Sequence, residues 1–65
     1  MSVAKVVEVI TEGKTIENAI ESAAQKAHDS VRHIRQVNVD NIQAIIENGK
    51  VTSYRVNAKV TFVME

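Results

Sequence analysis

The chain of 65 residues has no cysteine, no tryptophan and only two glycines. Without cysteine it can hold neither a disulfide framework nor a thiolate metal site. With one Tyr, one Phe and no Trp, a large aromatic core is not available. Two glycines cannot build a glycine-rich phosphate loop. The 8 basic and 8 acidic residues cancel, so no net charge indicates a nucleic-acid partner or an anionic membrane.

Long apolar runs are also missing. No run approaches the roughly 20 residues that a membrane-spanning helix needs, and the N-terminus lacks the basic start and apolar run of a signal peptide. We therefore expect a cytoplasmic protein with no membrane partner.

A domain near 60 residues buries only about 60% of its unfolded surface and is marginal alone. Small scaffolds are usually stabilised by disulfides, metals or oligomerisation. Because cysteine is absent and no dense ligand cluster is visible, oligomerisation remains, and the 45% hydrophobic content favours it.

Residues 50–64 alternate strictly between an apolar and a mostly polar set, which predicts one long strand. At about 3.3 Å per residue it would extend roughly 45–50 Å, well beyond a typical strand. A chain this short cannot cover both faces and both edges of such a strand, so we expect neighbouring subunits to do so.

Residues 3–11 predict another strand, apolar in both alternating sets, which is typical of a strand that is central or covered on both faces. Gly13 ends it. Thr15 is a good N-cap, and apolar residues at helical spacing predict a helix from there to about His33.

Residues 34–47 predict a further strand whose apolar parity shifts at Asp40–Asn41, the mark of a β-bulge. Asn48-Gly49 is a strong hairpin signal. A two-residue turn would pair Glu47 with Lys50 and place Ile42 opposite Arg55, on the wrong face. We therefore predict a three-residue loop of Asn48, Gly49 and Lys50. The register that follows pairs Ile46 with Thr52, Ala44 with Tyr54, Ile42 with Val56, Val39 with Ala58, Val37 with Val60 and Gln36 with Thr61.

The order strand, helix, strand, strand predicts a single α+β domain over residues 1–65. We expect a βαββ subunit, with a three-stranded antiparallel sheet wrapped on one helix, within a homo-oligomeric shell. The strand at 3–11 can lie beside the strand at 50–64, with the strand at 34–47 on the other edge.

Catalysis has no positive signal, since no serine has a recognisable base and acid, so we expect no enzyme. His28 and His33 are five residues apart, not the i, i+4 spacing of two ligands on one helix face, and solvation is the favoured interpretation. Asp40, next to Asn41, is a weak candidate metal ligand. Turn chemistry at the bulge is favoured over metal binding there.

The polar face of the predicted sheet carries the candidate ligand-binding residues, which are Gln36, Asn38, Arg55 and Asn57. Simple solvation would explain them. If subunits enclose this face, however, the buried polar groups need partners, and a set of amides with one guanidinium could bind a planar or anionic small molecule. On the predicted register Gln36 lies roughly 20 Å from Arg55 along the sheet.

Three runs resemble the dodecin family: VAKVVEVITEGKTIENAIESAAQKA, AHDSVRHIRQVNV and YRVNAKVTFVM. The resemblance covers nearly the whole chain. It implies βαββ subunits assembled as trimers into a hollow homododecamer that binds and stores riboflavin-type flavins, such as riboflavin or FMN, without turnover.

The same resemblance places Gln36 where flavin-binding dodecins carry the Trp that stacks on the flavin, and Arg55 where they carry a Gln that bonds its polar edge. Arg can stack on a ring but cannot accept hydrogen bonds. The missing Trp and the Arg in YRV look more like the calcium dodecins. Two hypotheses follow: a small-molecule storage protein with an altered flavin-type site, or a flavin-free calcium-binding or structural shell. In the second, Arg55 would form inter-subunit salt bridges to a carboxylate such as Glu8 or Glu47.

Overall fold

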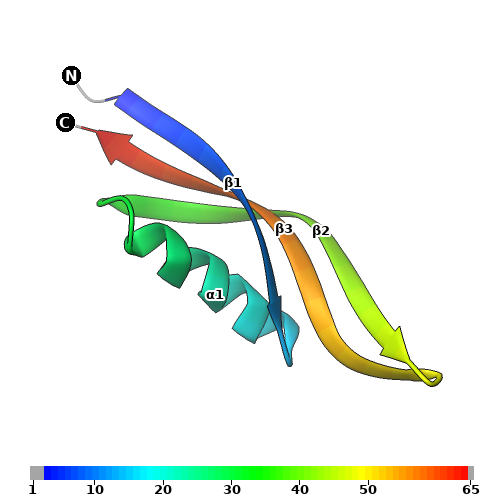
Figure 1. The fold of residues 1–65 in the computed structure, drawn as a ribbon. Helices are drawn as coiled ribbons and strands as arrows, with labels where there is room; N and C mark the ends of the chain where they lie inside the picture. The colour runs from blue at the N-terminus through cyan, green and yellow to red at the C-terminus, as the bar shows by residue number, and fades with distance from the viewer. Residues whose placement is uncertain (1–2, 65) are drawn as a thin grey trace.

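The computed structural model describes residues 3–64 and has the predicted βαββ order. Its elements are β1 (Val3–Gly13), α1 (Ile16–His28), β2 (Ile34–Glu47) and β3 (Lys50–Met64). One helix lies on one face of a three-stranded antiparallel sheet, which confirms the α+β class (Figure 1). The molecule is elongated, 52 × 19 × 13 Å. Among residues 3–64, no helix has the length and hydropathy that a membrane crossing requires.

The strand order is β1-β3-β2, so β3 is central and the predicted neighbours are confirmed. The expectation that β1 is central or covered on both faces is wrong for the single chain, because β1 is an edge strand. Two of its apolar residues, Val6 and Ile10, are 55% and 65% exposed. An apolar pattern on both faces shows that cover is needed, but it does not say whether the cover comes from the same chain.

The β2–β3 ladder has the predicted bulge at Asp40. Val39 pairs with Ala58 and Asn41 with Asn57, so Asp40 is the extra residue, and Figure 1 shows β2 bending near its middle. A bulge bends a strand and raises its local twist. On the N-terminal side of the bulge the predicted pairs are confirmed: Val39 with Ala58, Val37 with Val60 and Gln36 with Thr61.

The predicted three-residue hairpin loop is wrong. Asn48 and Gly49 form a two-residue turn with φ of 50° and 75°, as a type I′ turn requires, and Glu47 pairs with Lys50. A second bulge, at Thr52, restores the face register, so Ile46 pairs with Val51 rather than Thr52. Ala44 still pairs with Tyr54 and Ile42 with Val56, as predicted.

The helix starts as predicted and ends earlier. The backbone N–H of Asn18 donates a 3.0 Å hydrogen bond to the Thr15 hydroxyl, so Thr15 is the N-cap. The predicted end near His33 is wrong, because α1 ends at His28. The N–H groups of Ser30 and Val31 both bond the Ala27 carbonyl, which closes the last turn, and His33 then adopts a φ of 59°.

The core is the interface between α1 and β3. Three alanines of the helix are buried against four residues of β3, two of which have no exposed surface. The buried residues are Ala19, Ala23, Ala27, Val56, Ala58, Val60 and Phe62. Alanine lets the helix approach the sheet closely, and the Thr11 hydroxyl donates a 2.6 Å hydrogen bond to the Ala19 carbonyl. Within residues 3–64, no helix covers the opposite face of the sheet.

Candidate functional site

The helix-free face of the sheet carries rows of residues from all three strands. In an antiparallel sheet, directly opposed residues project to the same side. Around the middle of the sheet, the register assigns these residues to this face: Glu8, Ile10, Glu12, Asn38, Asn41, Gln43, Arg55, Asn57 and Lys59. Most of these residues are polar, as the alternation in residues 50–64 predicts.

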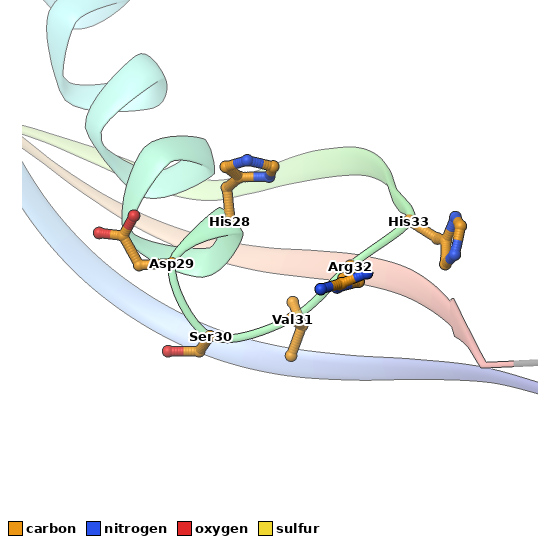
Figure 2. A pocket seen from close by; sticks show the side chains of 6 residues that line it. All are labelled: His28, Asp29, Ser30, Val31, Arg32 and His33. Carbon is orange, nitrogen blue, oxygen red and sulfur yellow. The ribbon is translucent and has the colours of Figure 1, made fainter.

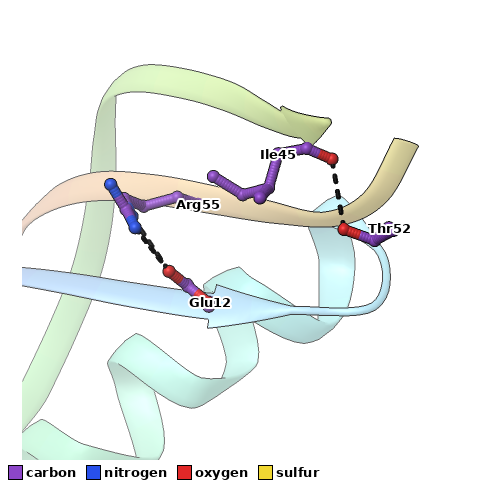
Figure 3. Close-up of polar contacts among 4 residues, drawn as sticks. All are labelled: Glu12, Ile45, Thr52 and Arg55. Carbon is purple, nitrogen blue, oxygen red and sulfur yellow. Dashed lines mark hydrogen bonds and ion pairs between the residues drawn. The ribbon is translucent and has the colours of Figure 1, made fainter. Parts of the chain in front are cut away.

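An ion pair between β1 and β3 lies in one of these rows. Arg55 is opposed by Glu12 on β1 and by Gln43 on β2. Its Nε and Nη2 atoms both donate to Oε1 of Glu12, at 3.1 and 2.7 Å (Figure 3). The two side chains are 44% and 50% exposed, so solvent limits the stability that the pair contributes.

A pocket of about 620 Å³ opens beside this ion pair on the helix-free face, lined by Ile10, Glu12, Gln43, Arg55 and Asn57. The structure therefore brings together two of the predicted ligand-binding residues, Arg55 and Asn57. The pocket offers a cation, a carboxylate, two amides and one apolar side chain, which can hydrogen-bond the edge of a small molecule and contact its apolar surface.

Asn57 has a side-chain oxygen, Oδ1, that is buried and has no hydrogen-bond partner among the described residues. A buried polar atom without a partner costs stability. The amide lies between Ile10 on β1 and Asn41 on β2 in the register. At this position the site has a hydrogen-bond acceptor, Oδ1 of Asn57, that no donor among the described residues satisfies.

The other two predicted ligand-binding residues lie elsewhere on the same face. Gln36 opposes Thr61, six residues from Arg55 along β3 and roughly 20 Å away at strand spacing. Asn38 opposes Lys59. Neither lines the pocket around Arg55, so one chain does not bring the four residues together.

Asp40, the weak candidate metal ligand, lies at the bulge with its Oδ2 atom 3.4 Å from Nζ of Lys59. Within residues 3–64, no group of three or more His, Cys, Asp or Glu side chains could hold a metal ion. The cationic neighbour of the Asp40 carboxylate is therefore Lys59. Metal binding by Asp40 stays a prediction.

Both histidines line a pocket of about 550 Å³ at the end of α1. Figure 2 shows their imidazoles apart, with His28 at the helix end and His33 at the far end of the loop. Both residues are exposed, in agreement with the prediction that they are solvated.

Ile10, Glu12 and Gln43 also line the pocket, although the sequence patterns did not indicate them as site residues. The hypothesis that Arg55 pairs with Glu8 or Glu47 did not include Glu12, which is its partner within the chain. The sequence feature that could have identified Glu12 is the pairing register between residues 3–11 and 50–64. Extending that antiparallel pairing to Gly13 places Glu12 opposite Arg55.

The sequence model of the Dodecin family matches residues 3–65. The chain belongs to the dodecin family. A solved variant of the Thermus thermophilus dodecin is 30% identical, with a TM-score of 0.91 over 100% of this chain and 98% of that one. The Streptomyces coelicolor dodecin is 25% identical, with a TM-score of 0.89 over 98% of this chain and 93% of that one.

A dodecin from Streptomyces davaonensis has the same fold at 15% identity, with a TM-score of 0.89 over 98% of this chain and 96% of that one. Another solved variant of the T. thermophilus dodecin has a tryptophan replaced by phenylalanine, whereas the present dodecin has no tryptophan. No curated protein sequence matches the chain.

Proposed function

We propose that this dodecin is the subunit of a non-catalytic homododecamer that binds or stores a small molecule of the flavin type on its helix-free face. The observation that carries the proposal is the pocket that joins Arg55 and Asn57 with Ile10, Glu12 and Gln43. Its volume of about 620 Å³ lies within the range of roughly 300–1,000 Å³ that is usual for ligand sites.

Self-association is supported by the apolar surface that one chain leaves uncovered. Val6 and Ile10 are exposed on the helix-free side, and the hairpin of β2 and β3 extends beyond β1 and the helix (Figure 1). Ile42, Ile46 and Val51 on this hairpin are about half exposed. Large exposed apolar patches mark interaction surfaces. By family resemblance we propose trimers that assemble into a dodecamer.

The flavin site is altered from the pattern that the family resemblance implies. Gln36 and Arg55 stand where a stacking Trp and an edge-bonding Gln are expected. The loss of an aromatic pair removes about 0.5–1.5 kcal/mol per ring contact. We therefore propose that riboflavin or FMN binds more weakly here than to a dodecin that carries the Trp, with Asn38 and Asn57 as further polar contacts supplied by neighbouring subunits.

The second candidate function is a flavin-free shell, either structural or calcium-binding. The Arg55–Glu12 ion pair favours the structural form, because it gives Arg55 a partner within the chain and needs no ligand. For calcium, the supporting feature is the Asp40 carboxylate at the bulge, and the ligand set would have to come from several subunits.

The native mass and the absorption spectrum of the purified protein test the first proposal together. A mass near twelve subunits, with flavin absorbance or quenching of added riboflavin at micromolar concentration, supports it. A colourless dodecamer that does not bind added riboflavin contradicts flavin storage. If calcium then raises its melting temperature, the calcium-binding shell is the better assignment.

The double variant Gln36→Trp, Arg55→Gln tests whether the site is homologous to the flavin site. We expect it to bind riboflavin more tightly than the parent protein. If the double variant assembles but gains no flavin affinity, the altered-site proposal is wrong.

A further inference from the structure

The guanidinium of Arg55 is oriented by two hydrogen bonds to Glu12. Two nitrogens on the same edge of its plane, Nε and Nη2, donate to a single oxygen of Glu12 (Figure 3). Two donors of one rigid plane that share an acceptor favour one orientation of that plane. The pair also joins the central strand to an edge strand, so its position depends on the sheet rather than on a loop.

The same pairing sets the charge of the pocket. The Glu12 carboxylate balances the Arg55 cation, so an anionic ligand would gain little net Coulomb attraction there. The Glu12 carboxylate occupies one edge of the guanidinium, and the Arg55 side chain is 44% exposed and lines the pocket. A guanidinium face stacks on an aromatic ring.

The surroundings of Arg55 suit a flat ligand. Ile10 is 65% exposed in the same pocket and presents apolar surface. Gln43 opposes Arg55 on the β2 side and can donate to and accept from a ring edge. None of the five described residues that line the pocket is aromatic. Arg55 is the one residue among them whose side chain is both planar and cationic.

We propose that the Arg55 guanidinium, oriented by Glu12, is the stacking platform for an uncharged planar aromatic ligand whose polar edge is bonded by Gln43. This assignment rests on the proposed small-molecule storage function and names the ligand class of that site. Arg55 touches the ligand in this proposal, whereas Glu12 acts through Arg55 as a positioning residue.

Fluorescence titrations with lumichrome and FMN test the proposal, because lumichrome is an uncharged planar ring and FMN adds a phosphate. We expect the assembled protein to bind lumichrome with little dependence on salt. Arg55→Lys keeps the charge but removes the plane, and should weaken lumichrome binding about three- to thirtyfold. Arg32→Lys makes the same exchange at an exposed arginine outside the pocket and should leave it unchanged.

Glu12→Gln gives an independent test that leaves Arg55 in place. It frees the cation, so FMN binding should strengthen relative to lumichrome and become salt-dependent. Native mass shows whether each variant assembles.

If Arg55→Lys assembles and binds lumichrome as tightly as the parent, the proposal that Arg55 is a stacking platform is wrong, whereas the proposed storage function is not contradicted. If Arg55→Lys does not assemble, an unchanged probe preference in Glu12→Gln overturns the platform. If the parent dodecamer binds neither probe, the storage function itself fails.

Discussion

Gly13, the last residue of β1, lies so close to α1 that a Cβ atom on it would be 2.6 Å from the backbone nitrogen of Ala19. Two further atoms, of Asn18, would be at 2.9 Å. The nearest of these groups is backbone, so a side chain cannot be accommodated by a simple rotamer change. The absence of a side chain at Gly13 therefore sets how closely the helix approaches the edge strand.

Gly13→Ala should destabilise the protein by about 1–3 kcal/mol through overpacking. Urea unfolding at a fixed subunit concentration measures this, since the stability of an oligomer depends on concentration. Gly49→Ala is the comparison, because Gly49 has open space around it and only its φ of 75° opposes alanine. That change should cost about 1 kcal/mol. A Gly13→Ala protein that unfolds at the parent urea concentration would contradict the close approach.

Thr15→Ala should cost about 1 kcal/mol, because the amide of Asn18 loses the hydroxyl that accepts its hydrogen bond. Thr15→Ser keeps an acceptor at the same place and should retain most of the parent stability. Thermal melts at equal subunit concentration compare the two variants. Equal losses in both would show that the methyl group rather than the cap matters.

His33→Val should destabilise the protein by about 1–3 kcal/mol, since a β-branched residue is poorly tolerated at a φ of 59°. His33→Gly should show no such loss, because glycine adopts positive φ freely. Arg32→Val, at the neighbouring exposed position with ordinary φ, should be close to neutral. The set is measured by urea unfolding, and a neutral His33→Val would refute the role of this backbone angle.

Val6→Glu should weaken subunit association. The side chain is 55% exposed on the helix-free face, and a charge buried there between subunits would lose its hydration. Ile16→Glu places the same charge on an apolar residue at the start of α1 that is also exposed, at 38%. It tests whether the effect is specific to the helix-free face. Native mass spectrometry should show smaller species for Val6→Glu, and intact assemblies for both variants would mean that this face lies outside the contacts.

Much of the fold could be predicted because local patterns specify it. The alternation of residues 50–64 and the parity shift at Asp40 place both strands and their bulge correctly. The hairpin was harder, because a two-residue turn and the correct face register are compatible only if Thr52 forms a second bulge. The predicted end of the helix was wrong because Val31 continues the apolar spacing, although the helix ends at His28.

The site was predicted in part for a different reason. Alternation identifies which residues share a face, and so it found Arg55 and Asn57. It does not give the register between strands that are distant in sequence, which is what brings Glu12 to Arg55. Alternation also placed Gln36 and Asn38 on this face, but a face extends along the whole sheet, and a single chain keeps Gln36 far from Arg55.

The three register shifts within residues 3–64 all lie between β2 and β3, and the eleven pairs of β1 with β3 contain none. The outer edge of β1 is therefore regular and has no proline or bulge to discourage pairing. A dissociated subunit would present this edge to any other chain. The recovery of soluble protein after heating should then fall as protein concentration rises, and an assembly that covers this edge would protect the chain against aggregation.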